Sequence, residues 1–313
     1  MIEVQNLIKK YGDTYAVDDV SFSIKQGEIV GFLGPNGAGK TTTMNILTGY
    51  LSPTMGKVLI DGIDIMEKPI EAKRNIGFLP ETPPLYTDMT VYEFLCFVYE
   101  LKCCDLNKEK HLNEVISTVK INDVKDRLIR NLSKGYKQRV GIASAIIGNP
   151  KIIILDEPTV GLDPQQIIEI RNLIRILGKS HTVILSSHLL NEVQAVCTRI
   201  LIINQGRIIA DEKASNLLGS LGQSTKIKVK VSGPQKEVYS ILNSLPGVTK
   251  ITESGIKEGD SFTFLVESKN GIDIRKPMFN ALAKKNFPIM GLENTEGELE
   301  DVFVKLIDSD KRR

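Results

Sequence analysis

Hydrophobic and polar residues alternate over the first thirty residues of the chain, a pattern typical of β-strands with one buried face. The alternating stretches 3–7 and 20–24 lie on either side of a turn at Gly12 and Asp13. Because strands joined by a glycine-containing turn commonly pair with each other, we expect the chain to begin with antiparallel strands.

Several later stretches are apolar without alternation, which indicates strands buried on both faces of a parallel sheet. These stretches are 29–33, 151–155, 182–187 and 199–203. Shorter strands are expected at 56–60, which precedes a glycine turn, and at 76–79, which Pro80 ends.

Apolar residues at three- and four-residue spacing predict helices from residue 90 to about residue 124. A further helix is expected to run through Ile147, because Ser133 is a residue type that caps helix N-termini. The first of these helical segments lies between two segments related to phosphate binding, as an inserted subdomain would.

The last ninety residues follow a different pattern, beyond a Gly- and Ser-rich stretch at 220–224 that we interpret as a linker. The pattern predicts strand, helix, strand, strand, helix and strand, at 226–231, 237–245, 248–253, 262–267, 274–285 and 289–293. This β-α-β-β-α-β order is that of ferredoxin-like modules. A final amphipathic helix is expected at 299–307.

The composition is that of a globular protein, with 42% hydrophobic and 25% charged residues among 313. The formal net charge of +2 argues against a large nucleic-acid surface, so no nucleic-acid partner is expected. The four cysteines lack C-x-x-C spacing and are expected to be reduced thiols. Without a signal-peptide layout or a long apolar run, the chain is expected to be cytoplasmic and to reach a membrane only through a partner.

The first candidate for chemistry is a glycine-rich stretch that fits the phosphate-binding pattern G-x-x-x-x-G-K-[ST], the P-loop. It comprises Gly34, Pro35, Asn36, Gly37, Ala38, Gly39, Lys40, Thr41 and Thr42. It follows an apolar strand and precedes an expected helix at 41–48, which is the context that the motif requires. The glycines allow backbone N–H groups to face phosphate oxygens. Lys40 is expected to bridge the β- and γ-phosphates, and the Thr41 hydroxyl to bind Mg²⁺.

A second candidate site lies at the ends of the apolar strands. Asp156 and Glu157 follow one strand, and His188 follows another. Ligands of parallel sheets bind beyond the carboxyl ends of the strands, so these side chains are expected at the ligand edge. Adjacent carboxylates on an extended strand point in opposite directions, which predicts different roles for the two. A lone histidine after a strand is more often structural, so position alone leaves the role of His188 open.

The order of these motifs resembles that of the ATP-binding subunits of ATP-binding cassette (ABC) transporters, over about residues 2 to 222. The shared features are the P-loop, the signature 132–136, the strand that ends in Asp156-Glu157, the stretch Gly161-Leu162-Asp163, and His188. The signature reads Leu-Ser-Lys-Gly-Tyr, and Glu81 stands where most members have glutamine. Both departures, together with the C-terminal stretch 299–303, resemble the exporter branch that includes drug, polysaccharide and gliding-motility-type systems.

The resemblance implies an α/β fold: a P-loop NTPase cassette with a mixed-sheet core, an antiparallel β subdomain and an inserted helical subdomain. We expect the ATP-binding domain over 1–222, with the helical subdomain at about 82–134. A small α+β ferredoxin-like accessory domain is expected over 223–313. It is expected to brace a dimer, and the alternative is a sensor for a small ligand.

The resemblance also implies roles in nucleotide binding and catalysis. Tyr11 would stack on adenine with Val17 beside it, although the position of Tyr11 alone is more typical of a packing residue. Glu157 would orient or deprotonate the attacking water, because phosphoryl transfer requires in-line positioning. His188 would contact the γ-phosphate and hold Glu157.

For the metal, the resemblance implies that Asp156 holds Mg²⁺ through water, together with Thr41 and Glu81. A carboxylate can replace an amide oxygen as a Mg²⁺ ligand. Since Glu81 adds negative charge beside the phosphates, we expect slower or more partner-dependent turnover.

The signature implies a site shared between two chains. Ser133 and Gly135 would contact the γ-phosphate held by the P-loop of a second copy, and Asp163 would lie at the seam. Lys134, in place of the usual glycine, either adds positive charge near the phosphates or is a solvated lysine. ATP would thus join two copies head to tail as a homodimer.

The resemblance predicts an ATPase subunit, with ATP and Mg²⁺ as cofactors, that drives export through a separate integral-membrane permease. It would be peripheral on the inner face of the cell membrane. The alternative is a soluble cassette ATPase that remodels a protein or nucleic-acid complex without a permease, and the single uninterrupted cassette counts against it. A P-loop kinase would have no use for the segment 133–139.

Overall fold

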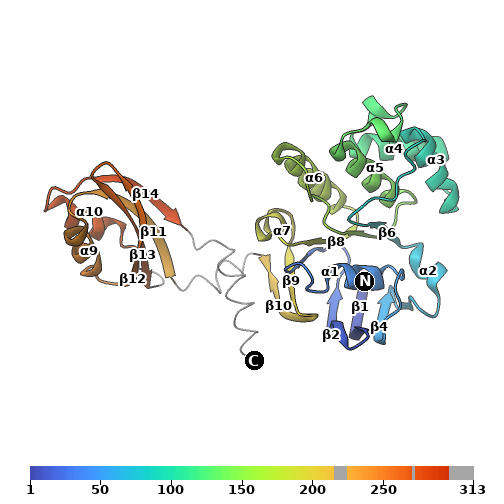
Figure 1. Ribbon diagram of the computed structural model, residues 1–313. Coiled ribbons are helices and arrows are strands. Elements are labelled where there is room, and N and C mark those ends of the chain that lie inside the picture. Colours follow the sequence, from blue (N-terminus) through green and yellow to red (C-terminus); the bar gives the residue numbers. More distant parts are fainter. Residues whose placement is uncertain (215–223, 270–271, 296–313) are drawn as a thin grey trace. The chain divides into compact units, whose positions relative to one another are not determined.

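A computed structural model describes residues 1–214, 224–269 and 272–295, and it divides the chain into two compact units, Met1–Ala214 and Ser215–Arg313 (Figure 1). Residues 220–223 of the expected linker and the expected helix 299–307 lie outside the described residues. Among the described residues, no helix combines the length and the apolar character that crossing a membrane requires.

The first unit begins with an antiparallel sheet, as the alternating pattern predicted. Strand β1 (Ile2–Tyr11) pairs with β2 (Thr14–Ile24) on one side and with β4 (Met55–Ile60) on the other, and β5 (Ile63–Asp64) completes the order β2-β1-β4-β5. The register places Ile2 opposite both Ile24 and Ile60, and all three side chains are fully buried. One face of this sheet therefore belongs to the core.

A six-stranded mixed sheet with the order β10-β9-β3-β8-β7-β6 forms the centre of the first unit. Its parallel strands are β3 (Ile29–Leu33), β6 (Ile76–Leu79), β7 (Ile152–Leu155), β8 (Thr182–Ser187) and β9 (Arg199–Asn204). The edge strand β10 (Arg207–Lys213) runs antiparallel to β9. Helix α1 (Lys40–Leu47) follows β3 and shares one hydrophobic core with both sheets.

The helical segment of the first unit contains α3 (Val91–Leu101), α4 (Lys108–Val119) and α5 (Lys134–Ile146). The helical pattern predicted from 90 to 124 is therefore broken. Cys103 has a positive φ of 48°, and Asn107 caps the N-terminus of α4. The expected cap of α5 is confirmed, because the Ser133 side chain accepts a hydrogen bond from the Tyr136 N–H.

Three further helices complete the first unit: α2 (Pro69–Lys73), α6 (Pro164–Leu177) and α7 (Leu190–Val196). Helix α7 packs against β3 and β8, and α6 packs against α7 (Figure 1). These two helices follow the stretches with Asp163 and His188, so they position two of the predicted site segments.

The second unit has the predicted element order β-α-β-β-α-β. The elements are β11 (Ser224–Ser232), α9 (Gln235–Asn243), β12 (Val248–Glu258), β13 (Ser261–Lys269), α10 (Arg275–Ala283) and β14 (Ile289–Thr295). They form an antiparallel sheet of order β12-β13-β11-β14. Buried residues of α9 and α10, including Leu242 and Met278, share one core with Val229 and Phe264 of the sheet.

Candidate functional site

The glycine-rich loop between β3 and α1 is shaped by positions that accept only glycine. Gly39 has a φ of 106°, and a Cβ there would lie 2.3 Å from the Ala16 carbonyl oxygen. A Cβ on Gly34 would lie 2.5 Å from the Ile203 carbonyl oxygen. Any side chain at either position would therefore displace the backbone beside it.

The loop opens onto a cavity of about 370 Å³. Its walls are formed by Ala16, Asn36, Gly37, Gly39, Lys40, Thr41, Thr42, Glu81, Glu157, Val160 and His188. Nine of these eleven residues are among those singled out from the sequence, and Ala16 and Val160 are not. Backbone N–H groups at a helix N-terminus, a lysine and hydroxyl groups are the donor set that binds phosphate.

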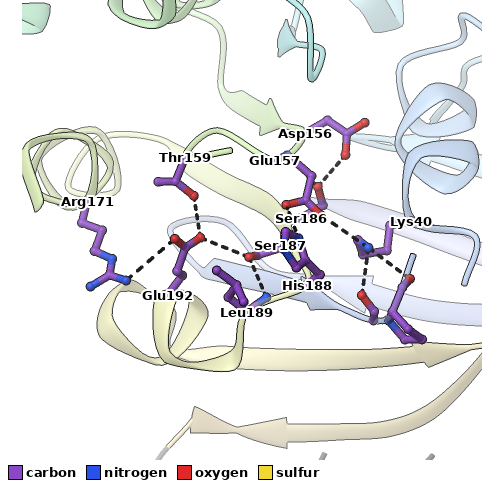
Figure 2. A network of polar contacts seen from close by, with 12 residues as sticks. Lys40, Asp156, Glu157, Thr159, Arg171, Ser186, Ser187, His188, Leu189 and Glu192 are labelled. Carbon is purple, nitrogen blue, oxygen red and sulfur yellow. Dashed lines mark hydrogen bonds and ion pairs between the residues drawn. The ribbon is translucent and has the colours of Figure 1, made fainter. Parts of the chain in front are cut away.

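A buried ion pair lies at the wall of this cavity. The Lys40 ammonium is 3.4 Å from Glu157 Oε1, and the two side chains are 5% and 9% exposed. The same ammonium donates hydrogen bonds to the carbonyl oxygens of Gly34, at 2.8 Å, and Pro35, at 3.2 Å. His188 Nδ1 lies 3.0 Å from Glu157 Oε2 (Figure 2). Glu157 is thus held between the phosphate-binding loop and the histidine.

The backbone of Glu157 departs from the expected extended strand. Strand β7 ends at Leu155, and Glu157 has a left-handed φ of 46°. The expected strand alternation is therefore wrong for this pair, because Asp156 and Glu157 lie beyond the strand. A positive φ is uncommon for a residue other than glycine, and it is often found where function constrains the backbone. Here the turn brings the Glu157 carboxylate to Lys40 and His188.

Asp156 is buried beside Glu157 with one carboxylate oxygen engaged and the other free. Its Oδ1 accepts a hydrogen bond from Ser186 Oγ at 2.5 Å, and its Oδ2 is buried without a hydrogen-bond partner in the protein. Burial raises the pKa of Asp156, and the hydroxyl groups of Ser186 and Thr41 oppose that change.

This arrangement suits a Mg²⁺ ion that is also held by a nucleotide, because Mg²⁺ takes one or two carboxylates together with phosphate oxygens and water. The described residues contain no group of three or more His, Cys, Asp or Glu side chains that could hold a metal ion alone. An unpaired carboxylate oxygen of Asp156, with Thr41 and Glu81 in the cavity wall, fits the expected ligand set.

Two residues expected near the adenine occupy different environments. Val17 is fully buried in the core of the first unit, and its neighbour Ala16 lines the cavity instead. Side chains alternate along a strand, so residues 16 and 17 face opposite sides of β2. Tyr11 ends β1, is 52% exposed and lies outside the cavity wall, with the Lys9 ammonium 5.3 Å from its ring centre.

The signature residues gather around the N-terminus of α6, away from the cavity wall. The Lys134 ammonium lies over Gly161, where a Cβ would be 2.2 Å from it. A Cβ on Gly135 would meet the Gln166 side chain at 2.6 Å. Asp163 caps α6, with its Oδ1 accepting a hydrogen bond from the Gln166 N–H at 2.9 Å. Within one chain, neither these residues nor Ser133 line the cavity.

Sequence reasoning missed the polar residues that support this site from behind: Thr159, Arg171, Ser186, Ser187 and Glu192 (Figure 2). Ser186 Oγ accepts a hydrogen bond from the Glu157 N–H and donates one to Asp156. Two consecutive serines at the end of an otherwise apolar strand were the available signal, since polar residues are rarely buried without a bonding role.

The chain matches known proteins over most of its length. The family model described as ABC transporter matches residues 17–160. The bacitracin transport ATP-binding protein BcrA of Bacillus licheniformis is 33% identical over 98% of this chain and 97% of its own length. The linearmycin resistance ATP-binding protein LnrL of Bacillus subtilis is 36% identical over 80% of this chain and 82% of its own.

Among solved structures, the chain resembles the ATP-binding cassette MJ0796 in a dimeric, post-hydrolysis state bound to ADP and Pi. The TM-score is 0.62 at 30% identity, over 68% of this chain and 99% of that one. The P-loop, the cassette fold and these matches agree. The chain therefore belongs to the ATP-binding proteins of ABC transporters, subunits that bind and hydrolyse ATP.

Proposed function

We propose that this chain, with Mg²⁺, hydrolyses ATP as a head-to-tail homodimer and thereby drives export through a separate integral-membrane permease. It would act in the cytoplasm, on the inner face of the cell membrane. The observation that supports the ATP-hydrolysing part most is the position of Glu157 between Lys40 and His188 at the wall of the cavity.

The proposed division of labour follows from the positions of the side chains. The P-loop, from Gly34 to Thr42, holds the phosphates through its backbone N–H groups and Lys40. Glu157 receives the proton of the attacking water or orients that water, and His188 holds Glu157 and contacts the γ-phosphate. Tyr11 provides a surface for the adenine at the exposed end of β1.

Mg²⁺ would be held by Thr41 and Glu81 and, through water, by Asp156, whose free Oδ2 supports this assignment. When bound, the ion neutralises the charge that develops on the β- and γ-phosphates. The Glu81 carboxylate would offset more of the positive charge of Mg²⁺ than the amide expected in most relatives would. The attraction of the ion for the phosphates would therefore be weaker.

The homodimer is proposed because the signature residues do not line the cavity of their own chain. Ser133, Lys134 and Gly135 of one copy would face the P-loop of the other, with Asp163 at the seam. The dimeric state of the related cassette MJ0796 supports this arrangement. The position of the Lys134 ammonium over Gly161 links the signature to the stretch that leads to Asp163.

The permease is proposed from the relatives, since BcrA is a transport protein and LnrL confers resistance. We further propose that 1–222 is the ATP-binding domain, with its helical subdomain at about 82–134 facing the permease. Residues 223–313 would form the accessory domain that braces the dimer.

The test is to tag the Glu157→Gln protein in its own host, solubilise the membranes in detergent with MgATP and identify the proteins that co-elute. A multi-span membrane protein in stoichiometric amount supports the proposal. The matched control is Lys40→Ala, which should not form the ATP-joined state. If only soluble proteins co-elute, the transport proposal is overturned and a cassette that remodels a soluble complex takes its place.

A further inference from the structure

A buried carboxylate lies behind the nucleotide cavity and is not one of its wall residues. Glu192 belongs to α7, and its side chain is only 7% exposed. Figure 2 shows it between two segments that reach the cavity: the one that continues from Glu157 and the one that carries His188. Neither the P-loop nor the proposed metal site explains why a carboxylate is buried there.

One oxygen of Glu192 joins the two segments. Its Oε2 accepts a hydrogen bond from Thr159 Oγ1 at 2.5 Å and another from Ser187 Oγ at 3.2 Å. The Ser187 hydroxyl has a single proton, which it donates to Glu192, and it in turn accepts a hydrogen bond from the Leu189 N–H at 3.0 Å. Both sequence neighbours of His188, Ser187 and Leu189, are therefore held by hydrogen bonds that lead to Glu192.

Ser186, the residue before Ser187, forms a second connection between the end of β8 and the residues that follow β7. Ser186 donates to Asp156 and accepts from the Glu157 N–H. Ser186 thus fixes the backbone at Glu157, whereas Ser187 and Glu192 fix the backbone on either side of His188. The His188 side chain itself is 38% exposed, so packing alone leaves it poorly restrained.

The charge of Glu192 is only loosely compensated. The ion pair that Glu192 forms with the described residues is with Arg171 of α6, whose Nη2 lies 4.0 Å from Glu192 Oε1. Arg171 Nε has no hydrogen-bond partner. A buried charge with such pairing is seldom the most stable way to fill a site, since desolvation opposes the attraction. The geometry that the carboxylate imposes on its two hydroxyl donors is the better reason for its presence.

We propose that Glu192 is a positioning residue for ATP hydrolysis. Through Thr159 and Ser187 it holds the segment after Glu157 and the His188 segment at a fixed separation, which keeps His188 Nδ1 near Glu157 Oε2. The inference rests on the proposed roles of Glu157 and His188. Because the contact acts on geometry and not on the P-loop, its loss should lower kcat and leave the KM for ATP unchanged.

The experiment measures kcat and KM for ATP hydrolysis by the purified full-length chain. Thr159→Val removes the hydroxyl at constant shape, and Thr159→Ser restores it. Thr182→Val is the matched control, since it removes another buried hydroxyl, at the start of β8, that accepts from the Gly27 N–H. All assays are run below the temperature at which circular dichroism first detects unfolding of any variant.

We expect Thr159→Val to lower kcat about tenfold, because small misplacements of catalytic groups cost that much or more. The KM of Thr159→Val for ATP should stay within about twofold of the wild-type value. The kcat values of Thr159→Ser and Thr182→Val should also stay within about twofold of wild type. Glu192→Met, which removes both acceptor oxygens at a similar side-chain length, should lower kcat as well. The double variant with Thr159→Val should lose much less than the product of the single effects, because both act through one contact.

A wild-type kcat in Thr159→Val, a KM effect without a kcat effect, multiplicative losses in the double variant, or no recovery in Thr159→Ser would each overturn the inference. Glu157→Gln and His188→Ala are assayed beside them. If these two lose turnover and Thr159→Val does not, only the positioning role is overturned. If they retain turnover, the proposed site is overturned and the positioning role with it.

Discussion

The Lys40 ammonium and the Glu157 carboxylate form a buried ion pair at 3.4 Å that connects the phosphate-binding loop to the end of β7. Glu157 reaches this position through a left-handed backbone conformation, and its other oxygen lies 3.0 Å from His188. Removing one member of such a pair leaves the other charge buried and unpaired, which is costly. The pair therefore links nucleotide binding to the group proposed to act on water.

Lys40 is the one lysine or arginine among the described residues that line the cavity, and Lys40→Ala removes its charge. We expect the dissociation constant for ATP to rise at least about 100-fold, because charge-assisted hydrogen bonds to phosphate are lost. Isothermal titration of MgATP measures the change. Lys57→Ala, on an exposed position of β4, is the matched control. Unaltered binding by Lys40→Ala would contradict the P-loop assignment.

Glu157→Gln keeps the shape of the side chain but removes its ability to accept a proton. We expect kcat for phosphate release to fall by about 100-fold or more, while ATP still binds with an affinity near that of wild type. Glu67→Gln, which changes an exposed glutamate outside the cavity wall, should have no effect. Substantial turnover in Glu157→Gln would exclude Glu157 as the group that acts on the attacking water.

Glu81 contributes a negative charge to the cavity wall, where most relatives are expected to have a neutral amide. Glu81→Gln keeps an oxygen that can bind Mg²⁺ and removes the repulsion of the phosphates. We expect the KM for MgATP to fall about threefold, the size typical of one exposed charge interaction, without a loss of kcat. Steady-state kinetics at fixed free Mg²⁺ tests this, and a higher KM would mean that the carboxylate is needed for the ion.

Lys102 predicts a pH dependence of stability in the helical segment. Its ammonium donates to three backbone carbonyl oxygens near the end of α5, those of Ser144 (2.8 Å), Ala145 (3.0 Å) and Ile147 (2.9 Å). Burial lowers the pKa of Lys102 from 10.5 to about 8. Between these two values the unfolded chain binds more protons than the folded chain, so the free energy of unfolding rises with pH.

The measurement compares wild type with Lys102→Met in denaturant unfolding followed by circular dichroism. We compare the free energy of unfolding of wild type with that of Lys102→Met at each pH. The difference, wild type minus variant, should rise by up to about 3 kcal/mol between pH 8 and 10.5 and should change little below pH 7. Other groups titrate in both proteins and cancel. A difference that is independent of pH would show that Lys102 titrates alike in the folded and unfolded chains.

The strands of the core could be predicted because their signal is local. Largely apolar runs bounded by turn residues correctly predicted β3 and β8 residue for residue. The edge strand β10 was missed, since its exposed residues are mostly polar. Helix α6 was also missed, although Asp163 followed by Pro164 is an N-cap and first-turn signal that could have revealed it.

The site depends more on tertiary structure than the strands do. The glycines and lysine of the P-loop carry their chemistry in a contiguous motif, so they could be identified directly. The left-handed backbone at Glu157 could not, because no residue type there requires it. Ala16 lines the cavity and Val17 does not, because of which face of β2 is turned toward the cavity. The contacts of Glu192 depend on how α7 packs.

We propose that ATP joins two copies of this chain across a shared site, and the mass of the Glu157→Gln protein in solution shows whether it does. One chain has a mass of 34.7 kDa. Light scattering coupled to size-exclusion chromatography should show a monomer without nucleotide and twice that mass at saturating ATP. Adding Ser133→Arg, at the signature, should return the monomer. A protein that stays monomeric at saturating ATP would contradict the shared site.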